Sequence, residues 1–259
     1  MAQRRRLVKE DLGGAELVEV DLRGAVLRHV DLTGARMRGV LLEDVEITGA
    51  VGGLVVNGVD VAPLVDAELD RRDPDRPSVL RPQGAGGFRR AWDVLERRWA
   101  ATYERARGLD PDLLHERVDG EWSFTQTLRH LLFATDAWIG RALLGDPEPW
   151  HPLDLPFEQL GPVEGIPSDD DARPSLEEVL ELRRSRWATV RAVLDDLTDE
   201  RLAETTEPVR VPEGRPGWPP PRGFPVRQCL SIVLEEEWEH RLYAERDLDA
   251  LLARAGEGA

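Results

Sequence analysis

Cysteine is almost absent from this sequence of 259 residues, since Cys229 is the only one. A single cysteine excludes an internal disulfide, and we expect the protein in the reducing cytoplasm. Long apolar runs are absent as well. No stretch of about 18 apolar residues occurs, which excludes a transmembrane helix, and no apolar segment follows the basic N-terminus, which argues against a secretory signal.

An excess of positive charge is also missing. The chain has 34 Lys and Arg against 50 Asp and Glu, a net charge of −16. This balance argues against binding to a nucleic-acid backbone, because no basic surface is available to displace counterions. The length and a hydrophobic content of 41% predict a globular protein with one large domain, or a small domain and a medium one.

From Leu12 to about Ala50 the sequence repeats every five residues. This period matches neither an α-helix nor a simple strand, and it is typical of a square solenoid with about twenty residues in each coil. The stretch therefore predicts about two coils, a short stack that we expect to rest on the rest of the protein at one end. We expect two residues of each repeat to point inward. The large ones are Leu12, Leu17, Leu22, Leu27, Leu32, Met37, Leu42 and Ile47, and the smaller ones are Ala15, Val20, Ala25, Val30, Ala35, Val40 and Val45.

Two of these repeats, Asp21-Leu22-Arg23-Gly24-Ala25 and Asp31-Leu32-Thr33-Gly34-Ala35, are similar to the consensus of the pentapeptide-repeat family. The resemblance implies a short right-handed β-solenoid, which we place at residues 1–60. Some members of that family imitate DNA and act on topoisomerases, so topoisomerase protection is one function that the resemblance implies. The outward positions here mix arginines with acidic residues, a poor imitation of a polyanion, which favours a docking module instead.

A connector with a short helix is expected at residues 61–86. Before it, Leu54-Val55-Val56 predicts a short strand and Asn57-Gly58 a turn. The segment 61–71 predicts the helix, with Pro63 in its first turn.

Residues 87–259 have a helical pattern throughout. Ser123 with Gln126 and Ser175 with Glu178 are capping boxes, and two proline-rich connections, 146–174 and 204–225, cross between helices. These features predict a mainly α protein with a small β part, in which the last domain is a four-helix bundle. The helices are expected at 87–107, 123–144, 175–197 and 226–252.

The last of these helices carries a candidate metal site. Glu236 and His240 are four residues apart, so that their side chains lie one turn apart on the same face. By itself this spacing is more typical of a solvated helix face than of a metal site. A third ligand has to come from another helix, and His130 is the best candidate.

His130 followed by Glu236 and His240 resembles the ligand set of the DinB-like superfamily of metal-binding four-helix bundles, over residues 88–254. Most of its members have histidine where Glu236 stands. A His, Glu, His set is instead similar to the mycothiol-dependent maleylpyruvate isomerase branch, which uses zinc. The motifs that carry the resemblance are Glu121-Trp122-Ser123, Thr127-Leu128-Arg129-His130-Leu131, Phe133-Ala134-Thr135-Asp136-Ala137-Trp138 and Tyr243-Ala244-Glu245-Arg246-Asp247-Leu248.

The resemblance implies a metal-dependent enzyme that transfers groups to or from a bound thiol. Three protein ligands leave a tetrahedral cation one open position, where a thiol would ionise and attack a small electrophile, or where a hydroxide could act in hydrolysis. Zinc is the expected metal, and the ligand types also suit nickel, iron or manganese. The main alternative is a non-catalytic metal-binding protein that uses its repeats for docking.

Two further residues are candidates for catalysis. Tyr243 follows His240 by three residues and is placed to donate a hydrogen bond in the same cavity, and His151 lies in a long loop that could face substrate. Cys229 precedes Glu236 by seven residues, about 10 Å along a helix, too far to bind the same ion. Bundles of this kind often pair, so a homodimer is expected as well.

Overall fold

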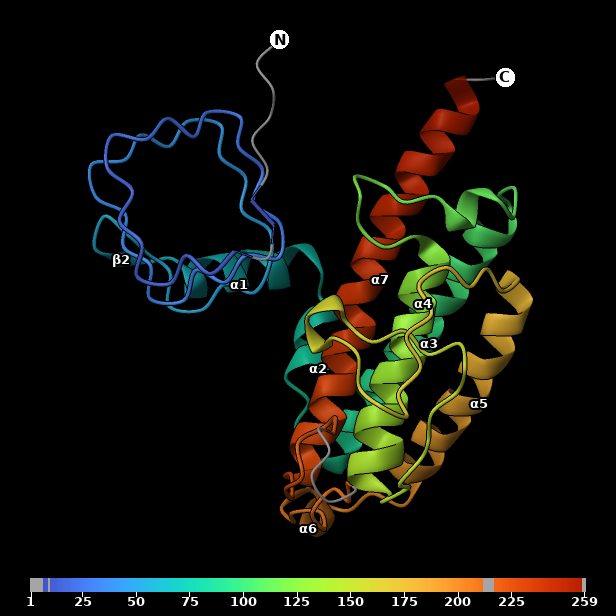
Figure 1. Ribbon diagram of the computed structural model, residues 1–259. Coiled ribbons are helices and arrows are strands. Elements are labelled where there is room, and N and C mark those ends of the chain that lie inside the picture. The colour runs from blue at the N-terminus through green and yellow to red at the C-terminus, as the bar shows by residue number, and fades with distance from the viewer. Residues whose placement is uncertain (1–6, 9, 212–216, 258–259) are drawn as a thin grey trace. The chain divides into compact units, whose positions relative to one another are not determined.

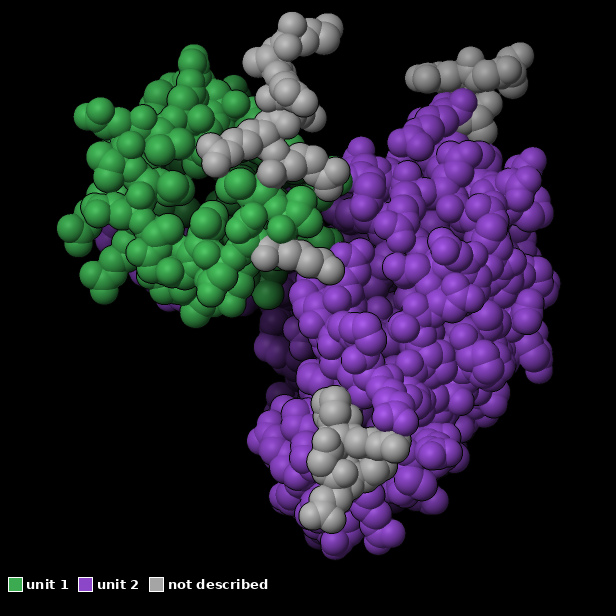
Figure 2. All heavy atoms as spheres, in the orientation of Figure 1, with its two compact units in different colours: residues 1–50 green, residues 51–259 purple. Residues whose placement is uncertain are grey.

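The computed structural model describes residues 7, 8, 10–211 and 217–257 of the chain. The chain divides into two compact units, residues 1–50 and 51–259 (Figure 2). This division falls after Ala50, whereas the sequence predicted a boundary at residue 60. Among the described residues, no helix is long and apolar enough to cross a membrane.

The backbone of the first unit winds in a squared coil (Figure 1), and its positive φ angles recur every five residues. The same turn recurs along the chain, where the carbonyl groups of Leu12, Leu22 and Leu32 each accept a hydrogen bond of 2.9 Å from the amide three residues later. The prediction of a coil with a five-residue period is thereby met, but a β-solenoid is not confirmed, because the described part of residues 7–50 contains no strand. Positive φ angles mark the corners at Gly14, Glu19, Gly24, His29, Gly34, Gly39, Asp44 and Gly49.

The apolar side chains of this unit remain accessible. Leu22 is 55% exposed and Leu32 is 50% exposed, and the other described residues of the unit are exposed too. In a stack of about two coils, each inward side chain has a neighbouring coil on one side only, so stacking cannot remove it from water. The residues predicted to point inward are therefore not buried.

The second unit begins with a small hairpin. Strands β1 (Val55–Val56) and β2 (Val59–Asp60) pair in antiparallel fashion around Asn57 and Gly58. Both turn residues have positive φ, 50° and 83°, which is the conformation that two-residue hairpins favour. Helices α1 (Ala62–Arg72) and α2 (Arg76–Leu80) follow. The strand, the turn and the first helix agree with the sequence prediction.

Four long helices form a bundle: α3 (Gly84–Arg107), α4 (Phe124–Thr135), α5 (Leu176–Asp195) and α7 (Val226–Glu257). Helix α7 packs against both α3 and α4, and α5 packs against the same two helices, so the four close around one interior (Figure 1). The predicted bundle agrees with this arrangement, and the predicted helix starts agree within three residues. The remaining elements are short: η1 (Leu113–His115), η3 (Glu158–Leu160) and α6 (Asp199–Leu202).

Helix α4 continues as a π-helix, η2 (Asp136–Leu143), where the sequence predicted one regular helix. Its wider turn is visible in the Leu144 amide, which donates to the carbonyl five residues back, at Ile139. A π turn rotates the side chains that follow relative to a regular helix, and such segments are common at functional sites. Here it begins six residues after His130.

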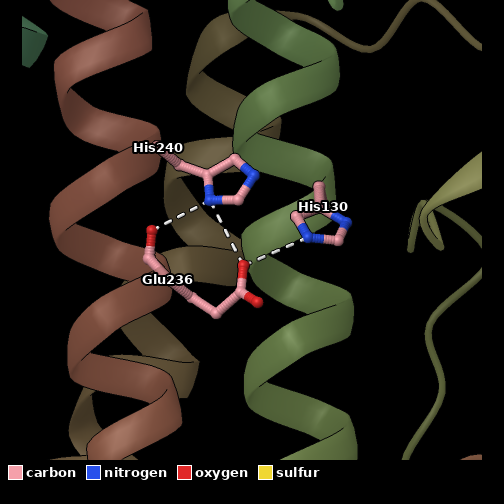
Figure 3. Close-up of side chains that lie close together, drawn as sticks. All are labelled: His130, Glu236 and His240. Atoms are coloured by element: carbon pink, nitrogen blue, oxygen red, sulfur yellow. Dashed lines mark hydrogen bonds and ion pairs between the residues drawn. The ribbon is translucent and has the colours of Figure 1, made fainter. Parts of the chain in front are cut away.

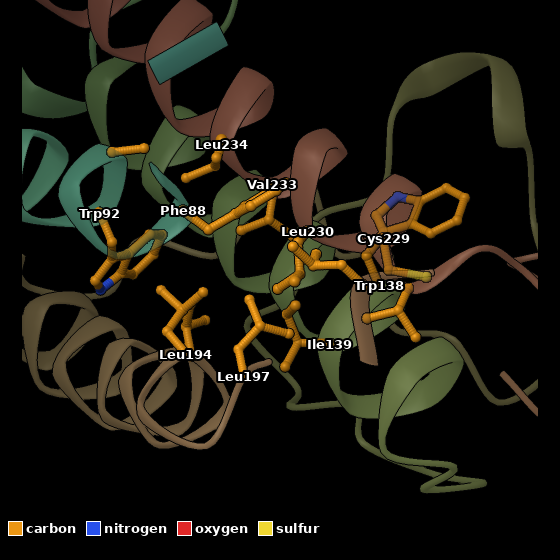
Figure 4. Packing of buried hydrophobic residues seen from close by; sticks show 14 of the residues in the cluster. Phe88, Trp92, Trp138, Ile139, Leu194, Leu197, Cys229, Leu230, Val233 and Leu234 are labelled. Atoms are coloured by element: carbon orange, nitrogen blue, oxygen red, sulfur yellow. The ribbon is translucent and has the colours of Figure 1, made fainter. Parts of the chain in front are cut away.

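The interior between the long helices is filled by large apolar side chains (Figure 4). Phe88 and Trp92 of α3 meet Leu194 of α5 and Leu230 and Val233 of α7, all almost inaccessible to solvent. Burying each such side chain contributes about 1.5–3 kcal/mol, so this cluster holds α7 firmly in the bundle. A second cluster around Trp99 continues the core toward the other end.

Candidate metal centre

The helix that carries His130 has a well-defined start. The Ser123 hydroxyl accepts a hydrogen bond from the Gln126 amide at 3.2 Å, and the Gln126 side chain accepts one from the Ser123 amide at 3.0 Å. This predicted capping box satisfies two amide groups of the first turn. Every residue of α4 is buried, and His130 is 4% exposed. The capped start of α4 therefore determines the position of His130 along the helix, opposite α7.

Three potential metal ligands meet between α4 and α7 (Figure 3). Glu236 Oε2 lies 3.3 Å from His130 Nε2 and 3.2 Å from His240 Nδ1. One ligand atom from each of the three side chains lies within 4.8 Å of the others. The structure thus brings together the three residues that the sequence singled out.

Hydrogen bonds indicate which nitrogen of each imidazole carries a proton. His130 Nδ1 donates to the Leu155 carbonyl at 2.9 Å, and His240 Nδ1 donates to the Glu236 carbonyl at 3.0 Å. In the neutral rings Nε2 then holds a lone pair, as in metal-binding histidines. The lone pair of His130 faces the Glu236 carboxylate at 3.3 Å. Two acceptors at this distance attract each other only through a proton or a cation between them.

The protonation states favour a cation. Burial alone would raise the pKa of the Glu236 carboxyl, but the contact with His130 and the two nearby imidazoles outweigh burial and hold this pKa below its ordinary value. Burial and the neighbouring His130 lower the pKa of His240 to about 4. At neutral pH the cluster therefore offers an ionised carboxylate and a neutral imidazole, the forms that bind metals.

The bundle matches a known family. The family model of the DinB superfamily fits residues 94–244, more than half of the chain. The chain belongs to the DinB superfamily. This superfamily is typically metal-binding, and the three-residue cluster lies within the matched residues.

The other comparisons add the following. Residues 11–44 match eight copies of the pentapeptide repeat. The crystal structure of a DinB-like protein from Bacillus cereus ATCC 10987 aligns with 67% of this chain and 94% of its own, at 19% sequence identity and a TM-score of 0.42. No curated protein matches the chain.

Aromatic side chains surround the candidate ligands of this DinB bundle. The Trp122 ring lies 4.6 Å from the His130 ring and 6.2 Å from the His240 ring, measured between centroids. The Tyr243 ring stands edge-on to His240 at 5.9 Å. Tyr243 therefore lies beside the cluster, as its spacing on α7 predicted. The aromatic rings limit the access of water to the imidazoles, which strengthens the electrostatic interactions among the ligands.

Two other residues considered from the sequence lie elsewhere. The contacts of His151 are local: its Nδ1 accepts a hydrogen bond of 3.2 Å from the Leu153 amide, and its own amide donates to Asp154 at 3.0 Å. His151 is thus not brought to the three ligands. Cys229 is buried in the apolar core, and burial raises the pKa of its thiol to about 11.

Sequence reasoning missed the residues that hold the long loop against α4. Arg129 is fully buried and donates hydrogen bonds to the carbonyl groups of Leu153, Asp169 and Ala172. These bonds place the segment that presents the Leu155 carbonyl to His130. The one available signal was an arginine within an otherwise apolar stretch beside a predicted ligand, whereas backbone carbonyl acceptors leave no trace in a sequence.

Two buried charged pairs were missed as well. Arg183 donates to Glu237 at 2.6 Å, and both side chains are at most 2% exposed. Asp154 lies against Asp136, which Arg186 binds through both carboxylate oxygens. Burial and the adjacent Asp136 raise the pKa of Asp154 to about 8, so that the two carboxyl groups share one proton at neutral pH.

Proposed function

We propose that this DinB protein binds one divalent cation, with zinc as the expected metal, through His130, Glu236 and His240. The observation that carries the proposal is the convergence of three side chains: His130 Nε2 lies 3.3 Å from Glu236 Oε2, and one ligand atom of each of His130, Glu236 and His240 lies within 4.8 Å of the others. Two imidazole nitrogens and one carboxylate oxygen suit zinc, and nickel, iron and manganese accept the same ligand types. Neither Glu236 nor His240 has to lose a proton at neutral pH to bind.

The proposed activity is that of a thiol-dependent transferase or isomerase, as in the mycothiol-dependent branch that the ligand order resembles. A divalent cation with three protein ligands keeps an open position, where it lowers the pKa of a thiol that binds. The chain offers no such thiol, because Cys229 is buried in the core with a pKa of about 11. We therefore expect a low-molecular-weight thiol as cosubstrate and a small electrophile as its reaction partner.

The surrounding residues have distinct roles in this proposal. The Leu155 carbonyl orients His130, and Arg129 holds the loop that provides this carbonyl. Trp122 packs beside both imidazole rings and limits the access of water to them. The Tyr243 hydroxyl has no hydrogen-bond partner among the described residues, so it is free to donate to a bound substrate.

A second function is favoured by the first unit. Its apolar side chains are about half exposed, which suits a surface that docks on a partner. In this alternative the cation stabilises the bundle and no substrate is turned over. The two functions differ in what happens when the ligands are removed: catalysis is lost in the first, whereas docking survives in the second.

Elemental analysis of the purified full chain tests the metal site. We expect about one zinc or other transition metal per chain in the wild type and in His151→Ala, whose imidazole lies outside the cluster, and none in His240→Ala. Absence of metal from wild-type protein after zinc loading would refute the proposal.

The loaded protein is then assayed for conjugation of mycothiol or glutathione with an electrophile such as monochlorobimane. Turnover that His240→Ala abolishes supports the enzyme. Stoichiometric metal without turnover across a panel of thiols would overturn the proposed activity and leave the docking function.

A further inference from the structure

A cavity of about 190 Å³ lies between α3 and α5. It is lined by Glu96, Ala100 and Tyr103 of α3 and by Leu180, Arg183, Arg184 and Trp187 of α5, and by no residue of the metal cluster. The exposed Ala100 places its mouth at the surface. Its walls are mostly the rings of the two aromatic residues and the aliphatic carbons of the others, a surface that favours a flat apolar molecule.

The volume limits the size of the occupant. A cavity of about 150 Å³ with apolar walls takes up benzene. At about 190 Å³, this cavity therefore has room for one aromatic ring with a small substituent. A bicyclic or longer compound would extend into solvent.

One polar group of the cavity lining has an unused donor. The Arg183 guanidinium lies over the Trp99 and Trp187 rings, at 5.0 and 5.3 Å, and its side chain is 2% exposed. Its Nε donates to the Tyr103 hydroxyl at 2.7 Å and its Nη2 to Glu237 at 2.6 Å. Its Nη1 has no acceptor among the residues that the structure describes. Nη1 is not among the buried side-chain atoms that lack a partner, so a ligand in the cavity can accept this N–H in place of water.

The charges around the cavity are already balanced. Glu237 neutralises Arg183. The two other charged residues of the lining are also paired, Glu96 with Arg191 and Arg184 with Glu181. An anion would therefore gain little from Arg183 and would lose its hydration on entry. An uncharged acceptor such as a carbonyl avoids that loss.

We propose that this cavity binds a small, uncharged aromatic compound with one hydrogen-bond acceptor, such as an aryl ketone. The ring packs against Tyr103 and Trp187, and the carbonyl oxygen accepts the N–H of Arg183 Nη1. The site is separate from the metal cluster and does not depend on the proposed thiol chemistry.

The test is a titration of the full chain with 4-fluoroacetophenone, followed by fluorine NMR. Ala100→Phe places a ring in the cavity, and Ala101→Phe is the matched control, because Ala101 is equally exposed on α3 and does not line the cavity. We expect the wild type and Ala101→Phe to bind alike and Ala100→Phe to bind at least about tenfold more weakly. Circular dichroism checks that both variants are folded.

Two further probes separate ring from acceptor. 4-Fluorotoluene has the same ring without an acceptor, and we expect it to bind at least about tenfold more weakly than the ketone. 4-Fluorobenzoate carries a charge and should also bind more weakly. Equal affinity of wild type and Ala100→Phe for the ketone, no detectable binding to the wild type, or tighter binding of either other probe would overturn the proposal.

Discussion

The buried carboxyl pair makes the stability of this protein depend on pH. Asp154 is completely buried, its Oδ2 accepts the His151 amide at 3.0 Å, and its Oδ1 has no hydrogen-bond donor among the described residues. Beside it, the Asp136 carboxylate is bound by Arg186. Two ionised carboxylates cannot lie together in this environment without a large cost, so the folded protein keeps a proton on the pair.

The sign and size of the effect follow from the two pKa values of Asp154. The pKa is about 8 in the folded protein and 3.8 as its ordinary value. Between these pH values the folded state holds one proton more than the unfolded state. The free energy of unfolding therefore falls as pH rises, by up to about 1.4 kcal/mol per unit, and this contribution is constant below and above the window.

Asp154→Asn tests this reasoning. An asparagine amide can accept the His151 N–H and donate to Asp136, so it replaces the protonated acid and should remove this slope. We expect the variant to gain up to about 2.7 kcal/mol over the wild type between pH 5 and pH 7. Asp171→Asn, an exposed position in the same loop, serves as the control.

The measurement is urea denaturation followed by circular dichroism at pH 5, 6 and 7, with a chelator present to keep the metal cluster empty. The difference between wild type and Asp154→Asn should widen with pH, while Asp171→Asn runs parallel to the wild type. Parallel lines for all three proteins would show that no proton is retained on the pair and would refute the reasoning.

Three other predictions concern the bundle. Arg183→Met leaves Glu237 buried without its partner. The variant should therefore lose about 3–5 kcal/mol of unfolding free energy, measured by urea denaturation. A second substitution, Glu237→Met, should largely reverse this loss. Cys229 should react with a thiol reagent at pH 8 only as fast as the protein unfolds, because burial raises its pKa to about 11; rapid labelling of native protein would contradict this. Gly84 has a φ of 61°, and a Cβ at this position would lie 2.9 Å from the Asp199 oxygen that caps α3. Gly84→Ala should therefore lower the free energy of unfolding by about 1–2 kcal/mol and lower the thermal midpoint. An unchanged midpoint would contradict this.

The bundle could be predicted because its signals are local. Capping residues such as Ser123 and Ser175 mark helix starts directly, and the hydroxyl of each accepts the amide three residues later. Only Ser123 forms the complete capping box that was predicted for both. The start of α3 was harder to predict, because the amide of Ala85 is capped by Asp199, which lies more than a hundred positions later in the sequence. The π-helix that begins at Asp136 was also missed, because its apolar spacing over two turns resembles that of a regular helix.

The repeat region could be predicted in period but not in packing. Positive φ angles recur every five residues, with the same period as the sequence. Whether inward side chains become buried depends instead on how many coils stack, and about two are too few to cover residues such as Leu22.

The candidate ligands could be named because Glu236 and His240 are neighbours on one helix. His130 was chosen as the third because it lies on another predicted helix, and the family resemblance supported the choice; nothing local connects it to α7. The groups that position His130 could not be predicted from the sequence. The Leu155 carbonyl and the Trp122 ring contact His130 only once the chain has folded. Interactions through backbone atoms and across long loops have no sequence pattern to read.

The division of the ligands between two helices has a consequence for folding. Glu236 and His240 come within reach of each other as soon as α7 is helical, whereas His130 joins from 106 positions away. Such distant contacts form late, after the chain has paid the entropy of closing the intervening loops. A cation that needs all three ligands therefore binds only after α4 has docked on α7, and at a hundred times its dissociation constant it would add about 2.7 kcal/mol to that docked state. Metal supply would then set how long each molecule stays assembled.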